Sequence, residues 1–183
     1  RPIELNTKDL TWPNEISVVP GDVFGERAIL VPDGFLVPGH SNGGLYVLRM
    51  DEADATVVKD QVALASGKRG YFYHKGEWID LNGDGRKDLL TARSNAKAGG
   101  GELLWLEHPS EGLDGEWTEH VIGPFADVMF TTDYDPAFSH EILVYAAHFF
   151  DEELVMTRLS TKDGTIQGSR VIDDTEIRSA YNV

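Results

Sequence analysis

Short apolar runs of strand length, separated by polar turns, recur along the chain at a spacing of about 50 to 60 residues. Three of these runs resemble one another and begin 58 and 51 residues apart, at Gly44, Glu102 and Glu153. Each follows a strand-like apolar segment and precedes a polar turn and a further β-rich segment. A repeat of this length with four short strands is typical of the blades of a β-propeller.

The pattern predicts three four-stranded repeats, at about residues 10–65, 76–123 and 124–174, with residues 175–183 beginning a further strand. The apolar spacing of a helix is nearly absent. A β-sandwich would also contain many short strands, but the recurrence favours a propeller. The expected fold class is all-β, a partial β-propeller forming a single domain over residues 1–183. The innermost strands are expected at residues 15–19, 77–80 and 127–130.

A loop rich in oxygen ligands separates the first two expected strands of the second repeat. Acidic or amide side chains stand at every second position, and a glycine able to take a positive φ follows them. Such oxygen donors suit a hard divalent cation, and we expect Ca²⁺. The expected ligands are the side chains of Asp80, Asn82, Asp84 and Asp88 and the backbone carbonyl of Arg86. In this interpretation the Arg86 side chain points to solvent.

Two other loop motifs share part of this spacing. An EF-hand needs a bidentate carboxylate at its twelfth position, which here is Thr91, so that motif is excluded. A metal-free Asn-Gly or Asp-Gly hairpin turn stays open, although such a turn would need neither Asp80 nor Asp88. In the third repeat Asp133 and Asp135 keep part of the pattern and are candidates for a second, weaker site.

The loop and its flanking segments resemble the FG-GAP/VCBS family of integrin-α-like β-propellers, in which such a loop joins the first two strands of a blade and holds calcium. The resemblance extends over residues 76–123. Residues 99–109 look like the third strand of that family's blade, and residues 116–123 look like the fourth. This resemblance implies a calcium-stabilised propeller. Because the smallest propellers close with four blades, we expect a larger propeller, self-association or a companion chain to complete the ring; a small four-bladed closure that uses the two termini is the remaining alternative.

Composition and charge restrict the possible functions further. The chain has 183 residues and no cysteine, which excludes disulfides, thiolate metal sites and cysteine nucleophiles. Its formal net charge of −15 disfavours nucleic acids and anionic membranes as partners. No apolar run approaches the roughly 20 residues of a membrane span. Because weak calcium loops fill where the free ion is abundant, we expect a secreted, extracellular protein.

Candidate chemistry gathers at the end of the expected blades opposite the calcium loop. The residues that could transfer protons, bind a metal or hold an anion there are His40, Tyr73, His74, Arg93 and His148. Polysaccharide lyases and a sugar dehydratase that resemble this family use similar sets of side chains. Loops also collect polar residues without any function, so the two interpretations stay open.

The function expected is a secreted, calcium-stabilised binding module for a carbohydrate or protein ligand. One alternative is a propeller enzyme of the lyase or dehydratase type, acting on an anionic or oxidised sugar. The other is a structural subunit of a multi-chain propeller. No nucleophile elbow, phosphate-binding loop or zinc spacing is found in the sequence.

Overall fold

A computed structural model describes residues 5, 7–8, 10–34, 42–65, 70–95, 100–134 and 139–175 of the chain. His40, Asp135 and the segment beyond residue 175 lie outside these residues, so the predictions made for them stay predictions. The one helix in the described part, α1 (Gly21–Phe24), is a single turn, and no helix there could cross a membrane.

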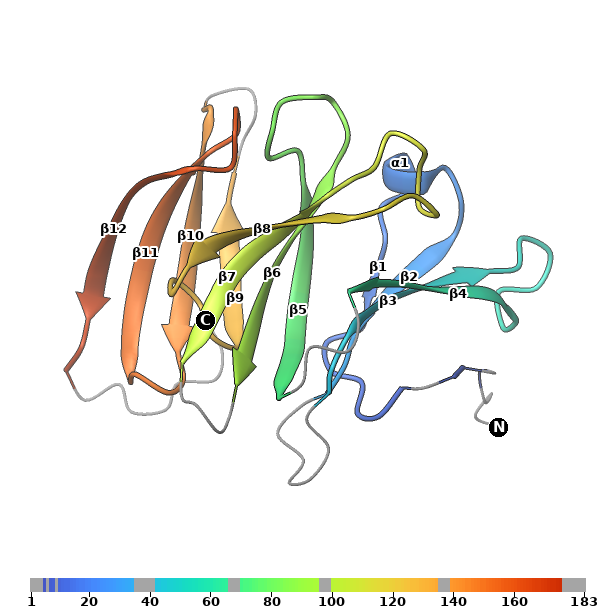
Figure 1. Cartoon of the computed structure of the whole chain (residues 1–183), viewed down its shortest axis with the longest axis horizontal. Coiled ribbons are helices and arrows are strands. Elements are labelled where there is room, and N and C mark those ends of the chain that lie inside the picture. Colours follow the sequence, from blue (N-terminus) through green and yellow to red (C-terminus); the bar gives the residue numbers. More distant parts are fainter. Residues whose placement is uncertain are drawn as a thin grey trace.

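Twelve described strands form three four-stranded antiparallel sheets, each in simple meander order (Figure 1). The first sheet contains β1 (Ser17–Val18), β2 (Ala28–Pro32), β3 (Leu45–Met50) and β4 (Val58–Ala65). The middle sheet contains β5 (Tyr71–Ile79), β6 (Asp88–Asn95), β7 (Gly101–Glu107) and β8 (Thr118–Gly123). The third sheet contains β9 (Met129–Asp133), β10 (Glu141–His148), β11 (Glu153–Ser160) and β12 (Ile166–Asp173).

The all-β class and the three four-stranded units are confirmed, whereas closure into a propeller ring stays a prediction. One boundary was wrong. The innermost strand of the second repeat is expected at residues 77–80, whereas β5 already begins at Tyr71 and includes Tyr73 and His74. A register shift between Tyr73 and Gly76 divides this strand, so its first half pairs with the end of β6 and its second half with the start. Aromatic residues favour such a pleated, half-buried surface.

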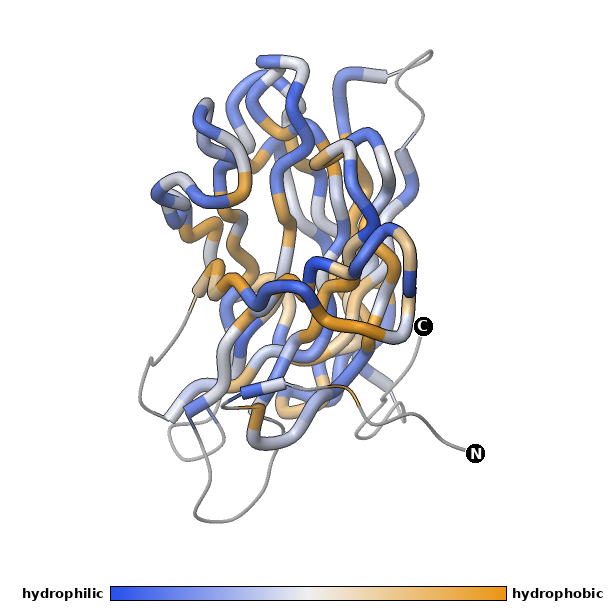
Figure 2. Tube along the Cα trace, turned by 90° about the vertical axis from the view of Figure 1, so that its right-hand side faces the viewer, coloured by the Kyte–Doolittle hydropathy of each residue, from blue (hydrophilic) through white to orange (hydrophobic). Residues whose placement is uncertain are grey.

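The sheets pack face to face, and each interface is filled by apolar side chains. Leu30 and Val47 of the first sheet share a buried cluster with Leu89 and Leu106 of the middle sheet. Leu90 and Trp105 point to the other face of the middle sheet and share a second cluster with residues of the third sheet, such as Phe130. Hydrophobic stretches of the trace lie inside and polar turns lie at the ends (Figure 2).

The two outer faces of this stack differ. Leu5 and Leu10, from the beginning of the chain, pack on the outer face of the first sheet against Tyr46 and Leu48. On the third sheet, pairing register places Leu143, Tyr145 and Met156 together on the outer face, where each is half-buried. These three side chains form an apolar strip on the outer face of the third sheet, and the same register places the exposed side chains of Asp133, Arg158 and Arg170 around it.

Gly101 sets the distance between the middle sheet and the segment that leads to the third. A Cβ atom at Gly101 would lie 2.2 Å from the Cα of Asp127 and 2.7 Å from the carbonyl oxygen of Ala126. We predict that Gly101→Ala lowers the free energy of unfolding by about 2 to 3 kcal/mol, because backbone must move to admit the methyl group. Urea unfolding would measure the change.

The matched control for this variant is Gly21→Ala, since a Cβ at Gly21 meets no atom within 4 Å. This substitution should leave the free energy of unfolding within about 0.5 kcal/mol of the wild type. Equal stability of the two variants would contradict the close approach at Gly101.

Candidate metal centre and binding groove

The oxygen-rich loop joins β5 to β6 at one end of the middle sheet (Figure 1). Ile79 and Asp88 are paired where the two strands enter the loop, and the buried side chain of Leu81 anchors its first turn in the core. Gly83 and Gly85 both have positive φ, of 76° and 85°. These two glycines let nine residues curl tightly, because other residues rarely adopt that backbone conformation.

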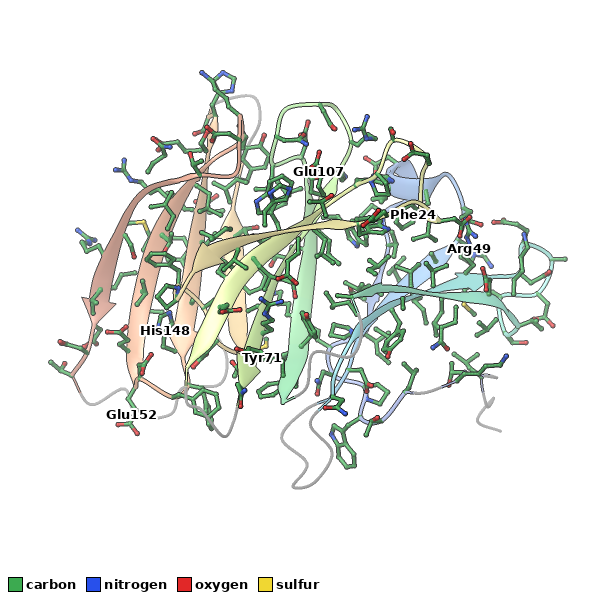
Figure 3. All side chains as sticks on the ribbon, in the orientation of Figure 1. Phe24, Arg49, Tyr71, Glu107, His148 and Glu152 are labelled. Atoms are coloured by element: carbon green, nitrogen blue, oxygen red, sulfur yellow. The ribbon has the colours of Figure 1, made fainter. Side chains whose placement is uncertain are left out.

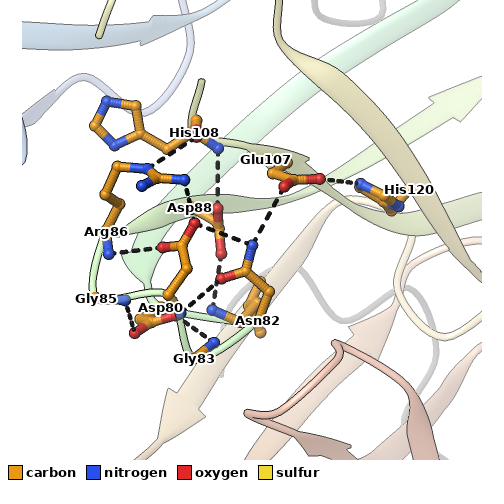
Figure 4. A network of polar contacts seen from close by, with 11 residues as sticks. Asp80, Asn82, Gly83, Gly85, Arg86, Asp88, Glu107, His108 and His120 are labelled. Atoms are coloured by element: carbon orange, nitrogen blue, oxygen red, sulfur yellow. Dashed lines mark hydrogen bonds and ion pairs between the residues drawn. The ribbon is translucent and has the colours of Figure 1, made fainter. Parts of the chain in front are cut away.

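Asp80 holds the curled loop together through its carboxylate (Figure 4). Its Oδ1 accepts a hydrogen bond from the Gly83 N–H at 2.7 Å, and its Oδ2 accepts one from the Gly85 N–H at 2.9 Å. Asn82 adds a shorter turn, with its Oδ1 accepting from the Asp84 N–H at 3.0 Å. The loop is therefore preformed by side chain to backbone hydrogen bonds of the Asx-turn kind.

Asp88 is fully buried beneath the loop. Its Oδ2 accepts from the Leu81 N–H at 2.8 Å and its Oδ1 from the His108 N–H at 2.9 Å. Burial raises the pKa of Asp88 to about 6; the two N–H groups lower it, and the charges of Asp84 and Asp80 raise it further. Three carboxylates at one loop, one of them buried, form a strongly negative site that a cation would stabilise.

The Arg86 side chain is 40% exposed and so reaches solvent as expected, but it also contacts the loop and the end of β7. Its guanidinium pairs with the Asp84 carboxylate, and its Nε donates to the carbonyl oxygen of His108 at 3.3 Å. Glu107, which the sequence did not single out, also borders the site: its Oε1 accepts from Asn82 Nδ2 at 3.4 Å. Its position at the end of β7, next to the loop, became evident only from the fold.

The donor set fits a hard cation in chemistry, because it consists of carboxylate, amide and carbonyl oxygens. Among the described residues, however, only His148, Asp151 and Glu153 bring three ligand atoms of His, Asp or Glu within 4.8 Å of one another. The three aspartates of the loop are spread more widely around it. Binding of a cation would require Asp80 and Asp84 to turn from backbone N–H groups and from Arg86 toward the centre of the loop.

The connections β6–β7 and β10–β11 lie at the end of the sheets opposite the oxygen-rich loop, as the strand alternation predicted (Figure 1). The pairs Ser94–Gly101 and His148–Glu153 close the strands at that end. The predicted candidates that lie among the described residues nevertheless do not form one constellation. The described contacts join Tyr73 to Arg93 within the middle sheet, whereas His148 contacts carboxylates of the third sheet.

Arg93 lies on the same face of β6 as Leu89, with only 1% of its surface exposed. Its Nε donates to Glu102 Oε2 at 2.7 Å, and its Nη1 donates to Glu119 Oε2 at 2.5 Å. Burial lowers the pKa of Arg93, but the hydrogen bonds to Glu119, Tyr73 and Glu102 outweigh burial and raise it. An anionic ligand would have to displace one of these carboxylates, so the geometry does not favour Arg93 as an anion-binding residue.

Tyr73 and His74 are both buried in β5. Burial raises the pKa of Tyr73, and burial together with the neighbouring Lys75 lowers the pKa of His74. Both shifts favour the neutral forms at pH 7. The Tyr73 side chain packs in the apolar cluster between the first and middle sheets, which assigns it a structural role.

A groove of about 330 Å³ opens beside Arg93 on the middle sheet. Tyr71, Asn95 and Glu102 provide an aromatic ring, an amide and a carboxylate there, and Val121 adds an apolar side chain. The rest of the lining is formed by Gly100, Gly101, Gly123 and Pro124. The Arg93 guanidinium lies 5.3 Å from the centroid of the Tyr71 ring and so holds the ring beside the groove.

Comparison with known proteins assigns no family to the chain. A scan against protein-family models found no match, and searches of curated proteins and of solved structures found no significant match.

We predict that Arg93→Met lowers the free energy of unfolding by about 2 to 3 kcal/mol, because Glu102 and Glu119 lose their shared counter-charge. The loss should fall short of that for a wholly buried pair, since the two glutamate side chains are 32% and 38% exposed. Chemical denaturation would measure it. Adding Glu119→Gln to Arg93→Met should recover part of the stability.

Arg158→Met is the control, because Arg158 is an exposed arginine that meets Glu141 at 3.8 Å. It should change the free energy of unfolding by less than about 1 kcal/mol. An equally small effect of Arg93→Met would show that the buried cluster does not depend on its positive charge.

Proposed function

We propose that the chain is a secreted, calcium-stabilised binding module of the β-propeller type, and that its ligand is a neutral carbohydrate. Calcium binding is supported above all by the position of Asp88. Its buried carboxylate lies under a loop that also contains the carboxylates of Asp80 and Asp84. A divalent cation would offset the mutual repulsion of these groups. It would also fix the β5–β6 connection of the sheet against which both other sheets pack.

Binding is favoured over catalysis because the candidate catalytic side chains do not converge. Tyr73 belongs to the packed interface between the first and middle sheets, Arg93 is held by two glutamates of the middle sheet, and His148 lies on the third sheet. The alternative of an enzyme for anionic sugars has no support from Arg93, whose charge is balanced by two glutamates.

The groove next to Arg93 favours a neutral carbohydrate. A sugar ring presents C–H groups on its faces and hydroxyl groups around its rim. The Tyr71 ring can pack against the C–H groups, while Asn95 and Glu102 can form hydrogen bonds with the hydroxyl groups. The carboxylate in the groove and the formal charge of −15 disfavour an anionic ligand.

The role of subunit in a larger propeller is favoured by one observation, the half-buried outer face of the third sheet. Leu143, Tyr145 and Met156 would be covered by a further four-stranded sheet, in the way that the third sheet covers the middle one. Further blades of a longer chain, a second copy or a companion chain could supply that sheet. This role is compatible with the binding function.

We predict that calcium at 100 times its dissociation constant stabilises the wild type by about 2.7 kcal/mol. For a chain of this size the melting temperature should rise by roughly 5 to 10 °C relative to EDTA. Asp84→Ala should abolish the rise, because it removes a ligand. Arg86→Gln should keep it, because the backbone carbonyl of Arg86 remains and the competing guanidinium is gone.

Asp163→Ala serves as the matched control for Asp84→Ala. Asp163 accepts hydrogen bonds in a turn, as Asp84 does, but it lies in the β11–β12 connection. Its response to calcium should equal that of the wild type. A wild-type melting curve that is the same in calcium and in EDTA would refute the calcium site.

For the ligand, we predict that the protein binds at least one neutral oligosaccharide from a set of gluco-, manno-, xylo- and galacto-hexaoses. Tyr71→Ala should weaken that binding about tenfold or more, through loss of the aromatic contact. Trp12→Ala is the control, because Trp12 is exposed and does not line the groove. Isothermal titration calorimetry, with oligogalacturonate as the anionic comparison, would measure the affinities. Binding of oligogalacturonate alone would favour the enzyme alternative.

A further inference from the structure

A histidine and two carboxylates meet at the turn between β10 and β11, far from the oxygen-rich loop. His148 ends β10, Glu153 begins β11, and the two are paired across the hairpin, with Asp151 in the turn between them. Figure 3 shows His148 at the lower ends of these strands, with Glu152 at the tip of the turn. The His148 Nδ1 lies 3.3 Å from Glu153 Oε1 and 3.8 Å from Asp151 Oδ2.

These separations fit a metal ion. A tetrahedral ion with bonds of about 2.1 Å places neighbouring ligand atoms about 3.4 Å apart. The three ligand atoms lie within 4.8 Å of one another, so small rotations of the two acidic side chains would complete the geometry. His148 is positioned by the strand and by burial, with its side chain 5% exposed, whereas Glu153 and Asp151 are 27% and 63% exposed.

We infer that His148, Asp151 and Glu153 form a second metal site, which takes a divalent transition-metal ion of the Zn²⁺ class. The imidazole nitrogen selects such an ion over calcium, which prefers oxygen ligands alone. Three protein ligands leave a coordination position for water, and the exposed side of the cluster gives the ion a path of entry. The oxygen-only loop at the other end of the sheets has the opposite preference.

The surroundings of the His148 imidazole affect the expected affinity for the metal ion. The His148 Nε2 is buried and has no hydrogen-bond partner in the part of the chain that the structure describes. Ligation through Nδ1 places the ring proton on Nε2, where no acceptor orients it. Acceptors of this kind are worth roughly 10- to 100-fold in metal affinity. We therefore expect micromolar binding rather than the much tighter binding of a closed structural zinc site.

The test is a titration of the whole chain with Zn²⁺ in saturating calcium, followed by calorimetry, and with Co²⁺, followed by visible absorption. We expect one Zn²⁺ per chain with a micromolar dissociation constant. His148→Ala should abolish measurable binding, and Asp151→Asn and Glu153→Gln should each weaken it about tenfold or more. The Asp84→Ala variant should bind Zn²⁺ as the wild type does, so failure of the calcium site and failure of this site are distinguishable.

His120→Ala is the matched control, because the His120 Nε2 lies 2.8 Å from Glu107 Oε2 in a pair of one histidine and one carboxylate. It should leave Zn²⁺ binding unchanged. The inference is overturned if the wild type binds no Zn²⁺, since the cluster is then only a contact between a histidine and two carboxylates. It is also overturned if His148→Ala retains the stoichiometric site. Should that variant not fold, Asp151→Asn decides, because Asp151 is exposed and its amide is nearly isosteric.

Discussion

Burial of β6 on both faces is the constraint on which the rest of the structure depends. The first sheet covers one face of this strand and the third sheet covers the other, so seven of its eight residues are buried. Apolar side chains satisfy that environment without further cost. The strand has two charged residues, Asp88 at its start and Arg93 near its end. Because both are buried, each needs hydrogen-bond or ion-pair partners close by.

The two compensations differ, and they give the two ends of the sheets different chemistry. Asp88 receives two backbone N–H groups but remains beside two other aspartates, so its end of the sheet is left with excess negative charge. Arg93 is paired with Glu102 and Glu119, so its charge is fully compensated and its end is left polar with a smaller excess of negative charge. A cation therefore suits the first end, and a ligand with hydroxyl groups and apolar faces suits the second.

The two proposed metal sites differ in their donor atoms. The loop between β5 and β6 offers only oxygen donors around a tight turn of nine residues. The turn between β10 and β11 adds the nitrogen of a buried, strand-anchored imidazole to two flexible carboxylates. Hardness of the donors and rigidity of the nitrogen ligand, rather than net charge, distinguish the sites. Neither site needs the other, since they lie on different sheets at opposite ends.

The repeat, the all-β class and the oxygen-rich loop were predictable from the sequence, because strand alternation, turn residues and ligand spacing are local properties. The loop's Asp80 and Asp88 were identified by spacing alone. Only the tertiary structure paired Arg93 with glutamates from β7 and β8, brought Glu107 to the loop, and assigned Tyr73 and His74 to a strand. It also set Glu153 opposite His148. Those facts depend on pairing register and on sheet stacking, which join residues distant in the chain and which no local pattern encodes.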